Sequence, residues 1–540
     1  MDGHLDVNDV SYHLPDGREL LHDVSFRVGT GDHVGLIGAN GVGKTTMLRL
    51  LAGRAQPDGG VISAGGPLAF MEQMLDSAAT PTLADLYLSH APVRYRDASD
   101  RFRNAELELA GSESSSRSSS TPDRDPNVAY ANALSAWEDL GGYDLEVLWA
   151  ASADRATGLG WRELADRPVD SFSGGEQKRL VLELLFASEF GILLLDEPDN
   201  FLDIPGKRWL ADRINESDKT VLYVSHDREL LATAVDKLVT IEARGAWTHG
   251  GSFEGWAEAR DARKARLDDE HKRWADERRR LFHHMKIMKQ RAWVSDANAG
   301  RARAAETRLR HFEEAGPPPE QVRDQNVSMR LDGGRTGKRV VMIEELELTD
   351  LTFPFDLELW YGDRIAVVGL NGTGKSHLLR LLAGQTIDHE GAWRLGARVV
   401  PGLFSQLHSH PEWTGRRLRE LLAEKGLERQ AAMSRLRRYE LTDASEQEWE
   451  TLSGGQQARF QILLLEIDGA NLLLLDEPTD NLDVASAEAL EGALASFAGT
   501  VVAVSHDRWF LRAFDWFLLF ADDGEVTDTD DPSLALLATA

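Results

Sequence analysis

The sequence predicts an α/β protein with two similar domains in tandem, joined by an α-helical hairpin. Three observations lead to this fold class. Four sequence blocks occur twice in the same order, short Val/Ile/Leu runs alternate with helical stretches in each half, and a charged helical stretch separates the halves. Such alternation is typical of a largely parallel, buried sheet with helices packed on it. At 540 residues the chain is also too long for one ordinary core.

The duplication is the strongest of these observations. The recurring pairs of blocks are 35–53 with 366–384, 171–180 with 451–460, 191–203 with 471–483, and 220–230 with 500–510. Their common order makes a chance resemblance between the halves negligible. We therefore expect a first domain over 1–255, a linker over 256–327 and a second domain over 328–540.

The two halves differ by an insertion. The first half spans 100 residues between Gln73 and Ser173, whereas the equivalent segment of the second half spans 47. We expect an insertion around 75–165 that is partly helical. Its Ser-, Pro- and charge-rich stretch at 111–127 is typical of a disordered loop.

Composition excludes several classes of protein. The chain has no cysteine, which excludes disulfide frameworks, Cys-ligated zinc and thiol nucleophiles and fits a reducing interior. The N-terminus shows no basic segment followed by an apolar one, so we expect no signal peptide. The longest apolar runs have strand length, so we expect no membrane insertion and a cytoplasmic location. With a formal net charge of −29, any contact with nucleic acid must come from a local basic patch.

Each half contains a glycine-rich P-loop pattern between an apolar run and a helical stretch. Glycines let backbone N–H groups face phosphate oxygens, and the following lysine is expected to reach the β- and γ-phosphates of ATP. A glycine turn without a ligand is the alternative. The predicted nucleotide-binding residues are Gly38, Asn40, Gly41, Gly43, Lys44, Thr45 and Thr46 in the first half and Gly369, Asn371, Gly372, Gly374, Lys375, Ser376 and His377 in the second. Thr45 and Ser376 are also expected to hold Mg²⁺.

Two carboxylates follow four apolar residues in each half, as Asp196-Glu197 and Asp476-Glu477. This position is the carboxyl end of a strand, where parallel sheets bind ligands. We assign each Asp to Mg²⁺ and each Glu to catalysis, because hydrolysis at phosphorus needs an oriented water. Carboxylates that merely cap a helix are the alternative for either pair.

Three further positions recur at the same offsets. His226 and His506 follow apolar runs within "VSHD" and are predicted catalytic sensors of the γ-phosphate, although a lone His is usually structural. Gln73 and Gln406 end short apolar stretches and are predicted to contact the nucleotide and Mg²⁺; an ordinary surface Gln is equally compatible. A Ser-Gly-Gly segment precedes a helical stretch in each half, where a helix N-terminus can hold an anion. These segments add Ser173, Gly174, Gly175, Glu176, Ser453, Gly454, Gly455 and Gln456 to the predicted nucleotide-binding residues.

With P-loop, Gln, Ser-Gly-Gly, Asp-Glu and His in this order, the chain resembles the ATP-binding cassette ATPases. The resemblance implies an α/β fold of two P-loop ATP-binding cassette domains in tandem, stacked head to tail. Each ATP site would then combine one P-loop with the other domain's Ser-Gly-Gly segment. The implied sites are Lys44, Asp196, Glu197 and His226 with Ser453 and Gly455, and Lys375, Asp476, Glu477 and His506 with Ser173 and Gly175. The chain departs from the family at the adenine-stacking aromatic, where Leu14 stands with Tyr12 close by, and "LTFPFDLELW" in the second half offers no clean counterpart.

The linker predicts an α-helical hairpin with a basic tip. Leu267, Trp274, Leu281 and Met288 are spaced by seven, and "VSDANAG" separates them from a second, shorter stripe. Between 261 and 310 there are fifteen basic against eight acidic residues. A solvated face is the alternative for such a helix. The basic excess lies toward the tip, where the predicted RNA-binding residues are Lys286, Lys289, Arg291, Trp293, Arg301 and Arg303.

Twin cassettes, no membrane domain and a basic helical linker resemble the ABC-F proteins. The resemblance implies a monomer that binds ATP and Mg²⁺, hydrolyses ATP and binds the ribosome. Its linker would act on P-site tRNA and 23S rRNA at the peptidyl-transferase centre, in translation control or in antibiotic resistance by ribosomal protection. The ATPase subunit of a membrane exporter of the macrolide type, and a DNA-repair or chromosome-associated cassette ATPase, are the alternatives.

Overall fold

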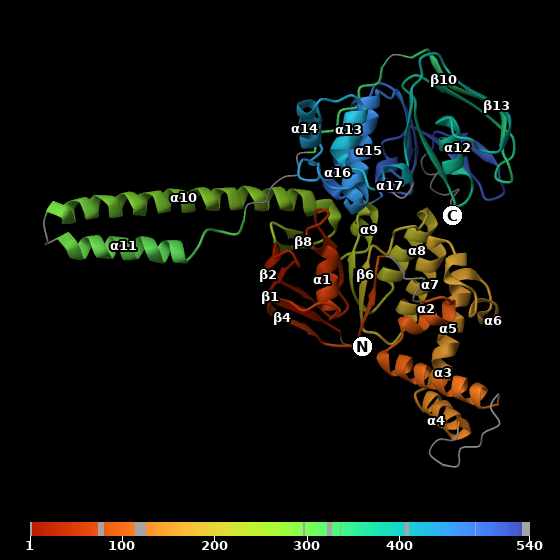
Figure 1. The fold of residues 1–540 in the computed structure, drawn as a ribbon, viewed down its shortest axis with the longest axis horizontal. Coiled ribbons are helices and arrows are strands. Elements are labelled where there is room, and N and C mark those ends of the chain that lie inside the picture. Colours follow the sequence, from red (N-terminus) through yellow and green to blue (C-terminus); the bar gives the residue numbers. More distant parts are fainter. Residues whose placement is uncertain are drawn as a thin grey trace.

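The computed structural model describes residues 3–73, 80–113, 126–294, 298–320, 327–334, 336–405, 410–480 and 482–531. Two α/β halves lie one above the other, and a long helical hairpin between them in sequence extends away from both (Figure 1). The predicted fold class is confirmed. No helix in these residues is both long and apolar enough to span a lipid bilayer.

The first half is built on a central sheet. Its strands, in sheet order, are β5 (Leu68–Met71), β6 (Ile192–Asp196), β7 (Thr220–Val224), β3 (His33–Ile37), β8 (Lys237–Glu242) and β9 (Gly245–Gly250). Strands β5 to β8 pair in parallel, and β9 runs antiparallel to β8. Every residue of β3, β6 and β7 is buried, as is typical of parallel strands covered on both faces.

A smaller antiparallel sheet packs beside it. Its strands, in sheet order, are β2 (Glu19–Val28), β1 (Leu5–His13) and β4 (Gly59–Ala64). Leu5, Val7 and Val10 of β1 share a core with Met47 and Leu48. The sequence predicted a largely parallel sheet and did not predict this antiparallel layer. Apolar and polar residues alternate along the strands of the layer, and no motif marks these strands.

Helices cover the sheets of the first half. They are α1 (Lys44–Leu51), α2 (Leu83–Ser89), α3 (Val93–Glu113), α4 (Pro126–Asp139), α5 (Gly142–Thr157), α6 (Trp161–Leu164), α7 (Gly174–Ala187), α8 (Ile204–Asn215) and α9 (Arg228–Thr233). Helices α3 and α4 of the insertion pack on each other and project away from the sheets (Figure 1). The insertion is partly helical, and helices α3 and α4 extend into the two ends of the stretch 111–127 that we expected to be a loop; 114–125 lie outside the described residues.

The second half repeats this plan. Its central strands, in sheet order, are β14 (Pro401–Phe404), β15 (Leu472–Asp476), β16 (Thr500–Val504), β12 (Arg364–Gly369), β17 (Trp516–Phe520) and β18 (Val526–Thr529). The antiparallel layer holds β11 (Phe355–Trp360), β10 (Arg339–Leu348) and β13 (His389–Leu395). The helices are α12 (Lys375–Leu382), α13 (Leu418–Glu424), α14 (Arg429–Arg438), α15 (Gly454–Asp468), α16 (Val484–Ser496) and α17 (Arg508–Leu511).

The hairpin consists of α10 (Trp256–Val294) and α11 (Ala299–Glu314). Helices α10 and α11 pack on each other, and Leu267, Leu281 and Leu309 of the predicted stripes are buried. The rings of Trp274 and Phe312 stack with centroids 5.6 Å apart. At about 1.5 Å per residue, the 39 residues of α10 give a reach of roughly 60 Å.

The two halves contact each other through charged side chains. Arg228 of α9 pairs with Glu491 of α16 and lies 3.5 Å from a carboxylate oxygen of Asp507. Arg512 of the second half donates a hydrogen bond to Glu229 of the first half at 2.9 Å. The facing elements are therefore α8 and α9 below and α16 and α17 above (Figure 1).

Candidate functional site: two ATP sites and a basic hairpin

Glycines make both P-loops possible. Gly38 has a φ of 155°, and a Cβ atom there would lie 2.4 Å from the carbonyl oxygen of Ile241. Gly43 has a φ of 108°, in the left-handed region that favours glycine. Gly369 and Gly374 repeat these values at 156° and 100°. Each loop therefore curls so that it leads into the N-terminus of α1 or α12, where an anion is favoured.

The two P-loop lysines are the first residues of α1 and α12, and both are buried. Lys44 Nζ donates to the carbonyl oxygens of Gly38 and Ala39 at 2.8 and 3.1 Å. Lys375 makes the equivalent contacts at 2.8 and 2.6 Å. Burial lowers the pKa of both ammonium groups. Each lysine spans its own loop and can exchange these carbonyl contacts for a phosphate.

Each P-loop opens onto a cavity shared by the two halves, of about 330 Å³ at Lys44 and about 360 Å³ at Lys375. The first is lined by Leu14, Arg18, Leu20, Asn40, Gly41, Gly43, Lys44, Thr45, Thr46, Gln73, Glu197, Ser453, Gly454 and Gly455. The second is lined by Ser173, Gly174, Gly175, Asp199, Phe201, Leu202, Lys207, Asn371, Gly372, Gly374, Lys375, Ser376, His377, Arg380, Asp476, Glu477, Asp480, Val504 and His506. In both, one P-loop faces the Ser-Gly-Gly segment of the other half.

Two hydrogen bonds between the halves border these cavities. The backbone N of Asn40 donates to Asp483 Oδ2 at 3.0 Å. Asn371 Nδ2 donates to the carbonyl oxygen of Phe201 at 3.2 Å. The two halves are therefore in head-to-tail contact beside both cavities.

Glu197 lies directly after β6 with a φ of 49°. Its carboxylate accepts hydrogen bonds from Gln73 Nε2 and Asn200 Nδ2, both at 2.5 Å. Burial raises the pKa of Glu197 to about 7, and the charges of Asp196 and Asp199 add to the rise. A carboxyl group with a pKa near neutrality is suited to take a proton from water.

Glu477 occupies the equivalent position with different neighbours. It accepts a hydrogen bond from the backbone N of His506 at 3.0 Å. Burial raises the pKa of Glu477 well above its ordinary value, and Asp480 contributes to the rise. Asp480 stands where the first half has Asn200, so a carboxylate replaces a hydrogen-bond donor.

The two histidines lie beside these glutamates. His226 Nε2 is 4.0 Å from Glu197 Oε1, although His226 does not border the Lys44 cavity. His506 Nε2 is 3.6 Å from Glu477 Oε1 and hydrogen-bonds with Asn371 Oδ1 at 3.2 Å. Burial lowers the pKa of His226 to about 3 and that of His506 well below its ordinary value. Both imidazoles are therefore neutral near pH 7.

The residues predicted for Mg²⁺ form a suitable oxygen set. Asp196 is buried, which raises the pKa of its carboxyl group, and a hydrogen bond with the Thr45 hydroxyl opposes the rise. Ser376 Oγ donates to Asp476 Oδ1 at 3.0 Å. In each half a carboxylate thus lies beside a hydroxyl, and such an oxygen pair fits a hard divalent cation. Gln73 borders the first cavity, whereas Gln406 lies outside the described residues.

The Ser-Gly-Gly segments begin α7 and α15 with capping boxes. Ser173 Oγ accepts from the backbone N of Glu176 at 3.2 Å, and Glu176 Oε2 accepts from the backbone N of Ser173 at 2.7 Å. Ser453 and Gln456 repeat the pair at 3.3 and 2.9 Å. Glu176 and Gln456 thus stabilise the helix start, and neither borders the cavities of the described chain.

Sequence reasoning missed several cavity residues. Arg18 and Leu20 line the Lys44 cavity together with Leu14, the residue expected there, whereas Tyr12 is not among the described lining residues. Lys207, from the first half, lines the Lys375 cavity. For Lys207, the available signal was its place just after the repeated blocks 191–203 and 471–483, where the sequences of the two halves stop matching.

Comparisons with known proteins show the family of the chain. The profile described as "ABC transporter" matches residues 21–200 and 353–480. "Antibiotic resistance protein" of Mycobacteroides abscessus is 49% identical over 98% of this chain and 99% of its own length. "Energy-dependent translational throttle protein EttA" of Haemophilus influenzae is 28% identical over 95% of this chain and 91% of its own. The chain belongs to the ABC-F family.

A solved structure gives the same architecture. The archaeal ribosome recycling factor aABCE1, in complex with the archaeal ribosomal stalk protein aP1, matches with a TM-score of 0.54 and 18% identity. The match covers 95% of this chain and 87% of that one. At this identity the likeness shows the fold alone. The two halves are ATP-binding cassettes, as predicted.

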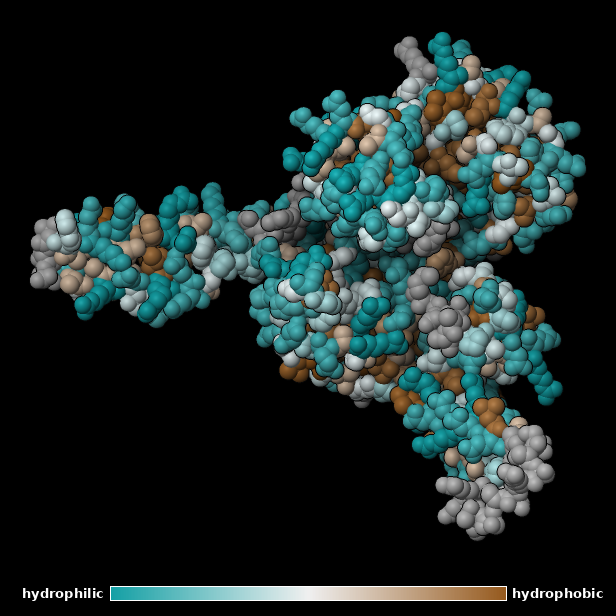
Figure 2. All heavy atoms as spheres, viewed as in Figure 1, coloured by the Kyte–Doolittle hydropathy of each residue, from teal (hydrophilic) through white to brown (hydrophobic). Residues whose placement is uncertain are grey.

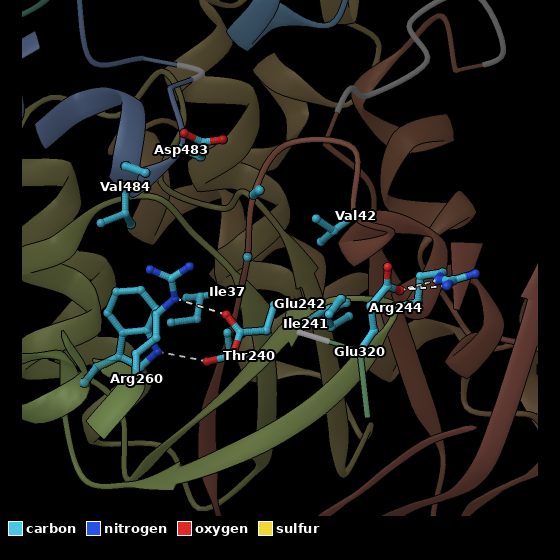
Figure 3. A pocket seen from close by; sticks show the side chains of 15 residues that line it. Ile37, Val42, Thr240, Ile241, Glu242, Arg244, Arg260, Glu320, Asp483 and Val484 are labelled. Carbon is cyan, nitrogen blue, oxygen red and sulfur yellow. Dashed lines mark hydrogen bonds and ion pairs between the residues drawn. The ribbon is translucent and has the colours of Figure 1, made fainter. Parts of the chain in front are cut away.

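The base of the ABC-F hairpin docks beside the first P-loop. Trp256 Nε1 donates to Thr240 Oγ1 at 2.9 Å, and Arg260 Nε donates to Glu242 Oε2 at 3.0 Å. These residues line a cavity of about 360 Å³ with Ile37 and Val42 of the P-loop region and Asp483 and Val484 of the second cassette (Figure 3). The hairpin base, the first ATP site and the second cassette therefore meet at one place.

The hairpin differs in charge between its base and its tip. Nearer the base, basic side chains form ion pairs, as in Arg278–Glu313 at 2.8 Å and Arg280–Glu277 at 2.7 Å. At the tip, Lys289 pairs with Glu306 at 2.7 Å. No described carboxylate pairs with the exposed tip residues Lys286, Arg291, Arg301 and Arg303. The side chain at the end of α10, Trp293, is 92% exposed.

Proposed function

We propose that this ABC-F protein is an ATPase that binds the ribosome and acts through its hairpin tip on P-site tRNA and 23S rRNA at the peptidyl-transferase centre. The outcome is translation control or antibiotic resistance by ribosomal protection. The names of two relatives support these outcomes, since one is a translational throttle and the other an antibiotic resistance protein.

The observation that carries the proposal is the tip of the hairpin. It combines basic side chains that pair with no described carboxylate with the 92% exposed indole of Trp293, in a chain whose net charge is −29. The hairpin surface is otherwise largely hydrophilic and reaches far from both cassettes (Figure 2). These side chains suit structured RNA. Basic groups bind the phosphates and fix the position of the protein, and an exposed aromatic ring can stack on bases or riboses.

The ATP sites supply the energy for this action. In each site the lysine and P-loop N–H groups would hold the β- and γ-phosphates, and the Ser-Gly-Gly segment of the other cassette would close over them. Thr45 with Asp196, and Ser376 with Asp476, would hold Mg²⁺, which neutralises charge on the phosphates when bound. Glu197 and Glu477 would accept the proton of the attacking water, and the neutral His226 and His506 would hydrogen-bond near the γ-phosphate.

The junction at the hairpin base supports coupling between ATP and the tip. Asp483 hydrogen-bonds the P-loop residue Asn40 and lines the same cavity as Trp256 and Arg260 of α10 (Figure 3). Closure of the second cassette onto the first P-loop would therefore press on the base of a lever of roughly 60 Å. A small rotation at the base becomes a large displacement at the tip.

The direct test is sedimentation with 70S ribosomes. The Glu197→Gln/Glu477→Gln variant should pellet with ribosomes in ATP and much less in ADP, because closed cassettes accumulate when hydrolysis is blocked. Cells that express the native chain should then be tested for susceptibility to a macrolide, a lincosamide and a pleuromutilin. Raised resistance favours ribosomal protection, and unchanged resistance with altered in vitro translation favours translation control.

Fractionation separates this proposal from the exporter alternative. An exporter ATPase subunit would sediment with membrane vesicles. It would not pellet with purified ribosomes in either ATP or ADP. A hairpin-deleted variant, with residues 258–315 replaced by a short Gly-Ser linker, is the matched control. If this control pellets with ribosomes as well as the full chain does, the hairpin is not the contact and the proposal fails.

A further inference from the structure

Lys207 distinguishes the two ATP sites. It lies on α8 of the first cassette, on the side that faces the second cassette, yet it lines the cavity of Lys375. Its side chain is 8% exposed, and Nζ lies 3.0 Å from Asp227 Oδ2. The equivalent position in the second cassette is Ala487, which is also buried. Of the described residues that line the Lys44 cavity, the second cassette supplies Ser453 and two glycines but no cation.

The carboxylates around Lys207 come from both cassettes. Burial by itself would lower the pKa of Lys207, but Asp227, Asp480, Asp199 and Asp507 raise it above its ordinary value, so it stays charged. Asp227 and Asp199 belong to the first cassette, and Asp480 and Asp507 to the second. One buried ammonium group therefore lies between carboxylates that closure brings together across the interface.

The duplication shows which charge Lys207 offsets. At the Lys44 site, the residue three positions after the glutamate is Asn200, which donates to Glu197. At the Lys375 site this residue is Asp480, whose carboxylate repels Glu477. Lys207 and Asp480 line one cavity, and their counterparts by sequence position in the other half-sites are the neutral residues Ala487 and Asn200. Acid and lysine thus occur together at one site and are absent together from the other.

We infer that Lys207 is a positioning residue supplied in trans, which offsets Asp480 so that the Lys375 site can close on the polyanionic nucleotide. The two sites then differ in what closure requires. The Lys44 site closes with a neutral Asn200–Ala487 combination, whereas the Lys375 site depends on one lysine of the other cassette. The inference rests on the part of the proposed function that puts ATP in the Lys375 cavity, and it is independent of the ribosome.

The test uses two reporter proteins that each bind nucleotide at one site. Lys44→Ala with Glu477→Gln reports the Lys375 site, and Lys375→Ala with Glu197→Gln reports the Lys44 site. Binding of a fluorescent ATP analogue with Mg²⁺ is titrated without ribosomes. In the first reporter, Lys207→Met should raise the half-saturating nucleotide concentration about tenfold, which corresponds to about 1.4 kcal/mol. In the second reporter, the same substitution should leave it unchanged.

Removing the charge of Asp480 tests whether Lys207 acts through its charge or only through its packing. Adding Asp480→Asn to Lys207→Met recreates the neutral combination of the other site and should restore binding to within about threefold of the first reporter (about 0.65 kcal/mol). Lys207→Arg, which keeps the charge, should bind nearly as well as the lysine protein. Equal weakening of both reporters, or no recovery with Asp480→Asn, would show a general structural role and overturn the inference. A first reporter that binds no nucleotide even with Lys207 would overturn the proposed ATP site itself.

Discussion

Removal of the tip charges that pair with no carboxylate in the described part of the chain tests the ribosomal function most directly. The perturbation replaces Lys286, Arg291, Arg301 and Arg303 by Ser. Lys289 is kept, because Glu306 already neutralises it at 2.7 Å. All four replaced side chains are exposed and lie far from both ATP cavities, so ATPase activity without ribosomes should stay near the native value.

The expected magnitude follows from counterion release. Each phosphate contact contributes roughly 0.7 to 0.9 to the slope of log affinity against log salt concentration. Four lost contacts should therefore make the slope shallower by roughly 3. Over a fourfold rise in salt, native binding should weaken about a hundredfold more than binding of the variant.

The matched control removes four paired charges from the same hairpin. Arg273, Arg279, Arg280 and Arg310 are exposed and form ion pairs within their own helices. Their replacement by Ser should change the slope by much less than replacement of the tip residues. The assay is pelleting with 70S ribosomes across a salt series, paired with in vitro translation with and without a macrolide. Equal slopes for native, tip and control proteins would refute the reasoning and leave the hairpin as a solvated spacer.

Three further outcomes are expected. Glu197→Gln with Glu477→Gln should retain ATP but lose turnover, because an amide cannot take up the proton of water; near-native phosphate release would show that another group is the base. Ser453→Arg should block nucleotide occupancy at Lys44 in a Lys375→Ala background, since the side chain enters the shared cavity; unchanged labelling there would rule out the composite site. Turnover at the Lys44 site should fall as pH drops through about 7, because burial raises the pKa of Glu197 to about 7 and the ionised form is the base. A pH–rate profile of the Glu477→Gln variant that stays level from about pH 8 to about pH 6 would contradict this assignment.

Local patterns were sufficient for the parts of the fold that a short stretch of chain specifies. The P-loops were predictable because left-handed glycines such as Gly43 and the following lysine are adjacent in sequence. The hairpin was predictable because a spacing of seven puts Leu267 and Leu281 on one face of a helix, where both are buried. The antiparallel layers were not predictable. The alternating pattern of a strand such as β1 indicates no function, and the register of β1 depends on its partners β2 and β4.

The sequence by itself predicted two P-loop cassettes, because each P-loop and each Asp-Glu pair is a contiguous run of residues that recurs in both halves. Only the tertiary structure decided which residues meet between motifs. Lys207 reaches a cavity whose own lysine lies 168 positions later in the chain, and Lys289 forms an ion pair with Glu306 on the opposite helix. The physical reason is that burial and charge pairing depend on distances in space. A sequence pattern contains neither the interface between the cassettes nor the residues that pack around a buried group.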